Sequence, residues 1–277
     1  MKSFRHDEIG YWSEVKLDIV REYASAYSKI MSTQSSIRKH IYIDAFAGAG
    51  QHLSRRTGEF VAGSPLNALD VSPHFKEVHL IDLHGGKAEE LRRLVGSQTG
   101  VFIYEGDSND VLLNQVFPRC RYEDYNRALC LLDPYALHVD WNVLQTAGQM
   151  RSIEIFYNFM IMDANMNVFW HHPERVAPNQ TERMDKVWGD RSWREAAYRQ
   201  APTLFGPVEE KTGNEEVAEA FRKRLQKVAG FKFVPDPIPM RNEKGAAVYY
   251  LFFASQNKTG AHIVKSIFDK YRARGMR

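Results

Sequence analysis

The chain has 277 residues, of which 44% are hydrophobic and 26% charged, a composition typical of a soluble globular protein with one large domain or two small ones. Its net charge of +3 permits an anionic partner without requiring one, because binding patches depend on local charge. Cys120 and Cys130 form no Cys-x-x-Cys pair, so we expect no bound metal. The N-terminus lacks the apolar segment of a signal peptide, and no apolar run reaches the ~18 residues of a membrane span, so we expect a cytoplasmic location.

The N-terminal half predicts alternating helices and strands. Apolar residues recur at a spacing of three or four over residues 13–37, which predicts an amphipathic helix capped by Ser13. A strand at 40–46 runs into a glycine turn that ends at Gly50, and the polar segment 52–62 predicts a loop. Ser64 and Pro65 predict the N-cap and first position of a helix. Strands at 77–82 and 101–104 flank a charged helix at 87–95.

The C-terminal half continues this alternation and then leaves it. The expected elements are a helix at 109–117, a continuously apolar strand at 128–133, a helix at 139–148, a strand at 152–160, an antiparallel strand pair at 231–234 and 248–255, and a basic helix at 258–274. The segment 161–228 is polar, aromatic-rich and mostly helical in pattern, so we expect a helical insertion there. The alternation predicts an α/β fold, with a parallel sheet covered by helices on both faces.

Four of the predicted strands end at or near an acidic residue, namely Asp44, Asp82, Asp107 and Asp133. The carboxyl ends of parallel strands meet at one edge of a sheet, where ligands bind in α/β folds, so these carboxylates are expected to share one crevice. The alternative for any one of them is a helix N-cap or a loop carboxylate.

The chemistry of this crevice favours an adenosine ligand. Asp82 could accept hydrogen bonds from both ribose hydroxyls, and Asp107 with Ser108 could meet an adenine amino group. Gly48 and Gly50 would let the ligand lie against the backbone. There is no third glycine of a dinucleotide fingerprint and no Gly-Lys-Ser/Thr, so a triphosphate is not expected.

The fourth strand leads into Asp133-Pro134-Tyr135. Proline fixes the backbone, so the flanking groups project at a set angle. Tyr135 could stack on a planar substrate while Asp133 or a nearby carbonyl accepts a hydrogen bond from its amino group. The alternative is an Asp-Pro turn with a packed tyrosine.

These motifs, in this order, resemble those of class I S-adenosylmethionine-dependent methyltransferases, and the Asp-Pro-Tyr segment is most similar to enzymes that methylate exocyclic amino groups of nucleobases. A closer resemblance is to the bacterial three-Cys-motif partner family. It rests on Asp44-Ala45-Phe46-Ala47-Gly48, Gly63-Ser64-Pro65-Leu66, Leu132-Asp133-Pro134-Tyr135-x-Leu137-x-Val139-x-Trp141, Met184-Asp185-x-x-Trp188-Gly189 and Trp193. The amino-methyltransferase motif usually has two prolines after the acid or amide, and this chain has one.

The resemblance implies a Rossmann-like class I methyltransferase fold, with a mostly parallel seven-stranded sheet and an antiparallel terminal strand. The core would comprise residues 41–160 and 229–277, preceded by a helical segment at 1–40 and interrupted by a lid or substrate-recognition subdomain at 161–228. It implies Asp133, Pro134 and Tyr135 as catalytic residues. The implied contacts of S-adenosyl-L-methionine are Asp44, Ala45, Phe46, Gly48, Gly50, Asp82, Leu83, Asp107 and Ser108.

The expected activity is therefore methylation of a nucleobase amino group in DNA or RNA. The target base would have to be flipped out of a duplex. Two alternatives stay open. One is a non-catalytic module of the same fold that binds a three-cysteine-motif protein, and the other is methylation of a small molecule or a protein.

Overall fold

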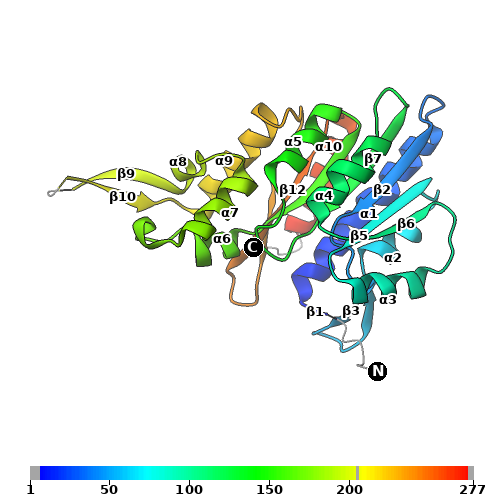
Figure 1. Cartoon of the computed structure of the whole chain (residues 1–277), viewed down its shortest axis with the longest axis horizontal. Helices are drawn as coiled ribbons and strands as arrows, with labels where there is room; N and C mark the ends of the chain where they lie inside the picture. Colours follow the sequence, from blue (N-terminus) through cyan, green and yellow to red (C-terminus); the bar gives the residue numbers. More distant parts are fainter. Residues whose placement is uncertain (1–6, 204–205, 274–277) are drawn as a thin grey trace.

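A central sheet of seven strands organises the chain in the computed structural model, which describes residues 7–203 and 206–273 (Figure 1). The strand order is β11-β12-β8-β7-β2-β5-β6. The strands are β2 (Lys39–Asp44), β5 (Glu77–Asp82), β6 (Val101–Glu105), β7 (Asn126–Leu132), β8 (Ile153–Phe159), β11 (Ile238–Arg241) and β12 (Ala247–Ala254).

The first five of these strands in the chain are parallel, and β2 lies between β5 and β7. In chain order their arrangement is 3-2-1-4-5, the doubly wound pattern, so the sheet is Rossmann-like. The last strand, β12, is antiparallel to both β8 and β11. The predicted fold class, an α/β fold with a mostly parallel seven-stranded sheet and an antiparallel terminal strand, is confirmed.

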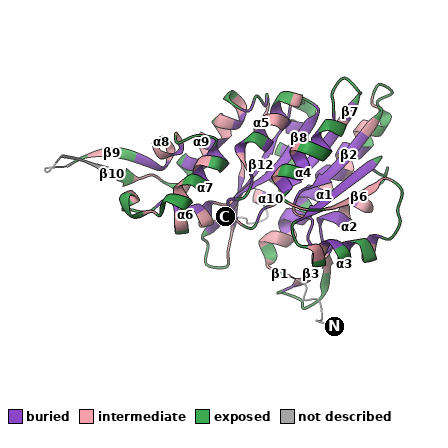
Figure 2. Ribbon diagram, in the orientation of Figure 1, coloured by how far each residue is buried: buried purple, intermediate pink, exposed green. Residues whose placement is uncertain are grey.

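Two layers of helices cover the sheet, each with its own cluster of buried apolar residues. One layer contains α1 (Tyr11–Thr33), α2 (Ser64–Leu69), α3 (Gly85–Val95) and α10 (Lys258–Ala273). The other contains α4 (Ser108–Val111), α5 (Trp141–Met150), α6 (Ile161–Asn167), α7 (Pro178–Trp188), α8 (Trp193–Ala197) and α9 (Asn214–Lys227). The strands β2, β5, β7, β8 and β12 are almost wholly buried, whereas β6 and β11, at the two sides of the sheet, are partly exposed (Figure 2). None of the described helices is both long and apolar enough to cross a membrane.

The predicted loop at 52–62 is wrong. This segment contains a hairpin of β3 (Gln51–Ser54) and β4 (Phe60–Ala62), and β1 (Glu8–Ile9) pairs with β3 in parallel. The small sheet packs against the glycine turn and buries little apolar surface, so most of its residues are polar. The sequence of this segment therefore resembles that of a loop. The predicted caps were also displaced, since Gly10 rather than Ser13 precedes α1 and Gly63 rather than Ser64 precedes α2.

The first strand of the expected antiparallel pair was placed wrongly. At 231–234 only Phe233 forms a bridge, to Ser255, whereas β11 begins at Ile238. β11 is an edge strand, and this position tolerates Pro239 because no neighbour on the open side needs its missing N–H. The predicted terminal helix agrees with α10 to Ala273, and residue 274 lies outside the described residues.

The segment 161–228 is not only helical. It contains an antiparallel hairpin of β9 (Tyr198–Thr203) and β10 (Gly206–Lys211), which extends away from the body of the molecule (Figure 1). Its last helix, α9, belongs to the core instead. Phe221 is fully buried and stacks on Phe159 of β8 with ring centroids 4.7 Å apart, and Trp188 and Phe252 pack edge-on against it.

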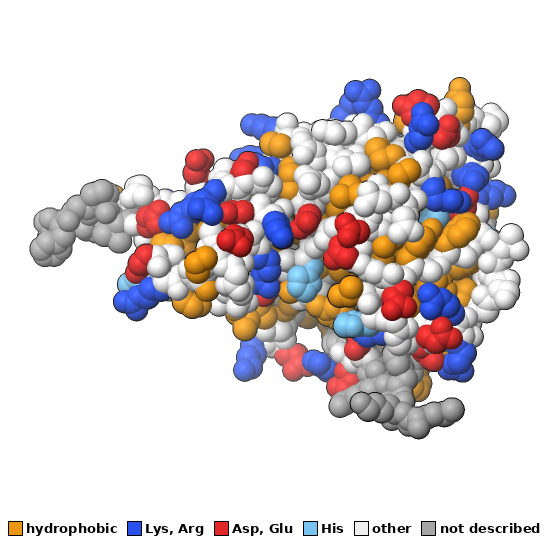
Figure 3. All heavy atoms as spheres, in the orientation of Figure 1, with side chains coloured by type: hydrophobic (Ala, Val, Ile, Leu, Met, Phe, Trp, Pro, Cys, Tyr) orange, Lys and Arg blue, Asp and Glu red, His pale blue; other side chains and the backbone are white. Residues whose placement is uncertain are grey.

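Charged side chains cover the outer surface in mixed signs. On the face seen in Figure 3, Lys and Arg side chains are interspersed with Asp and Glu. Many are neighbours on one helix, such as Arg93 with Glu90 and Lys265 with Asp269. Exposed pairs of this kind contribute little to stability. A binding site for a charged ligand therefore depends on local clusters of charged side chains rather than on the net electrostatic field of this face.

Replacing Phe221 with Ala should lower the free energy of unfolding by about 3–5 kcal/mol, because the ring fills a closely packed aromatic cluster and its loss leaves a cavity. Urea denaturation followed by circular dichroism would measure this. The matched control is Val228→Ala just beyond α9, where the side chain is 43% exposed and the loss should be under about 1 kcal/mol. Equal losses for the two variants would contradict the placement of α9 in the core.

Candidate active site

The glycine turn after β2 joins the carboxyl ends of three neighbouring strands. The Ala45 N–H donates to the carbonyl of Leu131 (3.0 Å), and the Ala47 N–H donates to that of Ile81 (2.9 Å). Gly48 and Gly50 have φ of +63° and +84°, a region that favours glycine. A Cβ on Gly50 would also lie 2.9 Å from Cδ1 of Leu91 in α3. The two glycines are therefore required by the turn and by close packing against α3.

Asp82, the last residue of β5, binds the glycine turn. Its Oδ2 accepts a hydrogen bond from the Gly48 N–H (2.9 Å), and its Oδ1 accepts one from the His84 N–H (2.8 Å). Each oxygen keeps a second lone pair, so further donors can still be accepted. The next side chain, Leu83, is 64% exposed. A carboxylate fixed in this way beside an exposed apolar side chain fits a ribose with an attached planar base.

Asp107 follows β6, and its hydrogen bonds support the alternative role that the sequence left open, that of a helix N-cap. The carboxylate is the N-cap of α4, where Oδ1 accepts from the N–H groups of Asn109 (2.9 Å) and Asp110 (3.2 Å). The Gly106 N–H donates to the Asp82 carbonyl (3.1 Å), which holds this turn against the end of β5. Ser108 is buried. The turn thus lies beside Asp82, and the adenine contact of Asp107 and Ser108 stays a prediction.

Asp44 ends β2 and is fully buried beneath the turn. Its Oδ1 accepts from the Phe46 N–H (3.2 Å), while Oδ2 has no hydrogen bond of ordinary geometry among the described residues, although the Ser64 hydroxyl lies near the carboxyl and opposes the rise of its pKa. Burial, and secondarily the negative charge of Asp133, raise the pKa of Asp44 to about 7. Asp44 pairs in register with Leu131, two residues before Asp133, so the two carboxyls follow the ends of neighbouring strands.

Asp133 is held by two residues that the sequence reasoning missed. The Lys16 ammonium of α1 donates to Oδ2, and the Asn158 amide of β8 donates to Oδ1. Lys16 is only 6% exposed and Asn158 is fully buried, with its Oδ1 unpaired among the described residues. Lys16 lies next to Val15 on the buried side of α1. A lysine at a buried helix position was the one feature of the sequence that could have indicated a buried ion pair.

Tyr135 follows the end of β7 by three residues and is 64% exposed. Its hydroxyl donates to Oδ2 of Asp7 (3.0 Å), and the ammonium of Lys87 in α3 lies 5.2 Å from its ring centre. Lys87 also donates to Asp7 (2.6 Å). The ring is thus contacted by an N-terminal residue and by α3, and its stacking on a substrate stays a prediction.

His52 in β3 is a second group that the sequence reasoning missed. A Cβ on Gly48 would lie 3.9 Å from its Cε1, so the ring packs on the glycine turn. Its Nδ1 is buried without a hydrogen-bond partner among the described residues. Burial, with the nearby positive charge of Lys16, lowers the pKa of His52 below its usual value, which favours the neutral ring. The unexpected β3–β4 hairpin is what brings it here.

The sequence matches no family model, and no curated protein matches it. Solved structures with a similar fold include a Legionella pneumophila protein (11% identity, TM-score 0.47, covering 92% of this chain and 91% of that one). Others are an S-adenosylmethionine-dependent methyltransferase of Mesorhizobium loti (13%, 0.40, 86% and 99%) and a Listeria monocytogenes protein proposed to have that activity (14%, 0.43, 85% and 99%). At these identities and scores the likeness supports no conclusion about activity.

Replacing Asp44 with Asn should make stability less dependent on pH. Because the folded pKa of Asp44 is raised from 3.8 to about 7, the protonated carboxyl stabilises the fold fully below about pH 4, and this contribution is lost as pH rises to 7. Relative to the wild type, the variant should gain on the order of 4 kcal/mol of unfolding free energy between pH 4 and pH 8. Urea denaturation at several pH values measures this. The exposed control Asp110→Asn should follow the wild type, and a pH-independent difference for Asp44→Asn would refute the assignment.

Replacing Lys16 with Met should destabilise the fold by about 3 kcal/mol, because Asp133 loses the cation that compensates its partly buried charge. The double variant Lys16→Met/Asp133→Asn should recover at least half of that loss, since no unpaired charge then remains. Chemical denaturation of the wild type, both single variants and the double variant gives the coupling. Strict additivity of the two single losses would show that the pair is not coupled.

Proposed function

We propose that the protein is an S-adenosylmethionine-dependent methyltransferase that acts on an exocyclic amino group of a nucleobase in DNA or RNA. The observation that carries this proposal is the common edge formed by the ends of β2, β5 and β7. There Asp82 holds the glycine turn, and the buried Asp44 ends β2, the strand between those that lead to Asp82 and to Asp133-Pro134-Tyr135.

The chain's own residues fit an adenosyl ligand. The free lone pairs of Asp82 suit the two ribose hydroxyls, and the exposed Leu83 side chain can pack on the adenine ring. The positive φ of Gly48 lets the ligand approach the backbone. The cofactor, S-adenosyl-L-methionine, would supply an already activated methyl group, so alignment and exclusion of water are what remain for the protein to provide.

For the substrate, the residues after β7 supply hydrogen-bond acceptors. The amino group becomes more positive during methyl transfer, so an acceptor strengthens its hold as the reaction proceeds. Lys16 and Asn158 fix the Asp133 carboxylate, which would position it and the Pro134 carbonyl toward the amine. Tyr135, whose side chain is exposed, would clamp the ring of the base. Lys16 and Asn158 are positioning residues in this proposal.

Calorimetric titration with S-adenosylhomocysteine tests the cofactor site. The wild type should bind it, and Asp82→Ala should weaken binding at least tenfold because the ribose loses its acceptor, a difference of about 1.4 kcal/mol or more. Asp110→Ala, on the surface of α4, is the control and should bind like the wild type. Since Asp82 also holds the glycine turn, the melting temperature of each variant must be recorded. Absence of wild-type binding at about 1 mM ligand would end the proposal.

Transfer of tritiated methyl groups to total bacterial DNA and RNA tests the reaction. The wild type should label one of the two, and Asp133→Ala should lower labelling at least a hundredfold while cofactor binding stays within threefold, because Asp133 acts on the substrate. Nuclease digestion followed by mass spectrometry of the nucleosides should place the methyl group on an exocyclic nitrogen. Label on a ring carbon, or only on protein, would contradict the assigned substrate.

Two observations favour a second candidate, a non-catalytic module of this fold that binds a three-cysteine-motif protein. Both oxygens of Asp133 already accept hydrogen bonds from within the protein, and the motif has a single proline. This candidate predicts binding of the cofactor or of the three-cysteine-motif protein, with no methyl transfer to any nucleic acid. Labelling of DNA or RNA above the level of Asp133→Ala would exclude it.

A further inference from the structure

We propose that a cavity at the N-terminus of α1, here called the aromatic pocket, receives an unstacked base and the adjoining phosphates of a single-stranded polynucleotide. The cavity has a volume of about 690 Å³ and lies between the first turn of α1 and the turn that joins β11 to β12. Its walls include Tyr11, Trp12 and Tyr249, and its charged groups include Arg55, Arg241 and Lys244. The inference rests on the methyltransferase function proposed above and assigns its substrate-binding surface.

Two elements that line the aromatic pocket, α1 and β12, also contact the residues around Asp133. Trp12 lines the pocket, and Lys16, which pairs with Asp133, follows it by one turn on the same side of α1. On the sheet, Tyr249 is two residues before Leu251, which pairs with Asn158, the second partner of Asp133. A base in this pocket would therefore lie near the carboxyl ends of β7 and β8, where the amino-group acceptors are.

The walls suit a planar ring. Tyr11 and Trp12 pack edge to face, with ring centres 5.3 Å apart and an interplanar angle of 65°, and Tyr11 is 49% exposed. Tyr249 is 7% exposed, and although Ser13 lies near its hydroxyl, that hydroxyl has no hydrogen bond of ordinary geometry among the described residues. Sites that bind single strands commonly contain aromatic side chains on which bases stack. An unpaired polar atom in the wall, here the Tyr249 hydroxyl, can form a hydrogen bond with the edge of a base.

The charge around the pocket suits phosphates. Its lining contains three cations and one carboxylate, that of Glu243; Arg55 is paired with Glu8 (3.7 Å), so Arg241 and Lys244 are the cations that remain for a phosphate. Arg241 donates through Nη1 to the Gly245 carbonyl (2.8 Å), which orients the guanidinium. No carboxylate within the described ranges forms an ion pair with Arg241 or Lys244. The pocket also contains the N-terminus of α1, whose cap residue Gly10 supplies no side chain, so the first N–H groups and the helix dipole favour an anion there.

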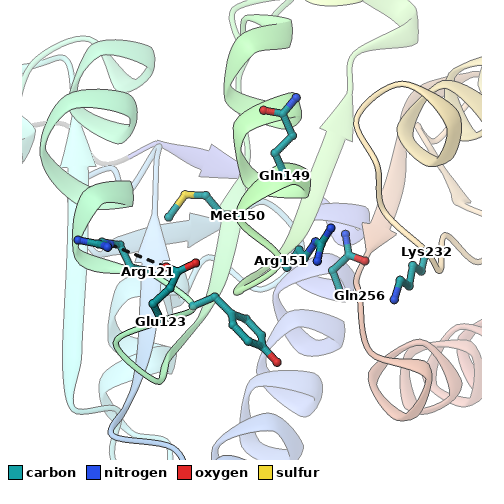
Figure 4. Close-up of a pocket in the computed structure, with 8 residues that line it drawn as sticks. Arg121, Glu123, Gln149, Met150, Arg151, Lys232 and Gln256 are labelled. Atoms are coloured by element: carbon teal, nitrogen blue, oxygen red, sulfur yellow. Dashed lines mark ion pairs between the residues drawn. The ribbon is translucent and has the colours of Figure 1, made fainter.

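A second cavity provides a matched control. It has a volume of about 530 Å³ and lies at the amino ends of β7 and β8, at the opposite edge of the sheet (Figure 4). Arg151 and Lys232 line it and, like Arg241 and Lys244, have no carboxylate ion-pair partner in the part of the chain that the structure describes. Because β7 has seven residues, the two edges of the sheet are about 23 Å apart along this strand. Removing two charges there changes the net charge equally without touching the aromatic pocket.

The test measures binding of a fluorescein-labelled 15-nucleotide single strand of mixed sequence, as RNA and as DNA, by fluorescence anisotropy with saturating S-adenosylhomocysteine. Trp12→Leu removes the ring and keeps an apolar side chain, and Arg241→Gln/Lys244→Gln removes the two charges. Each should weaken binding of the preferred strand at least tenfold. The control Arg151→Gln/Lys232→Gln should stay within twofold of the wild type. Raising the salt concentration should weaken the wild type more steeply than Arg241→Gln/Lys244→Gln.

Calorimetry with S-adenosylhomocysteine on the same variants separates this inference from the function on which it rests. Unchanged cofactor affinity with weakened strand binding supports both. Wild-type strand affinity in the charge variant and in Trp12→Leu, with normal cofactor binding, overturns the aromatic pocket and leaves the methyltransferase proposal standing. A wild type that binds the cofactor but neither strand also overturns the pocket. A wild type that does not bind the cofactor refutes the proposed function itself.

Discussion

The parallel pairing of β2 with β5 on one side and β7 on the other is the constraint on which the candidate site depends. Asp44 pairs in register with Leu80 and Leu131, so the three strands end at nearly the same level. The glycine turn can then bond to both neighbours, and Asp82 and Asp133 come to lie on either side of Asp44. A slip of one residue in either pairing would turn alternate side chains to the other face of the sheet and take the carboxylates apart.

The helix α1 links this edge to the surface of the molecule. Its apolar residues fix it to one face of the sheet, and this packing carries Lys16 to Asp133 and the Tyr11–Trp12 pair to the aromatic pocket. The ion pair is the reason that a charged residue can lie on the buried side of a helix, since a lone ammonium there would be costly. The same helix therefore stabilises the proposed acceptor for the amine and forms a wall of the proposed base pocket.

The sheet and the acids at its edge could be predicted from local patterns. Apolar runs bounded by glycine or by acids give the strands, and the parallel arrangement follows from their alternation with helices. The parts that escaped prediction depend on contacts between distant residues. Lys16 and Asp133 are 117 positions apart, and β1 pairs with β3 across a whole helix and strand. His52 reaches the glycine turn only because β3 and β4 form a hairpin whose polar sequence resembles a loop.

A crystal structure of the protein with S-adenosylhomocysteine tests the central claim most directly, because it reports on the ligand and on Asp133 together. Our interpretation predicts the ribose hydroxyls on Asp82, the adenine against Leu83, and the sulfur directed toward Asp133-Pro134-Tyr135, with Lys16 and Asn158 still bound to Asp133. A ligand bound at another edge of the sheet, or one whose sulfur is directed away from Asp133, would contradict it.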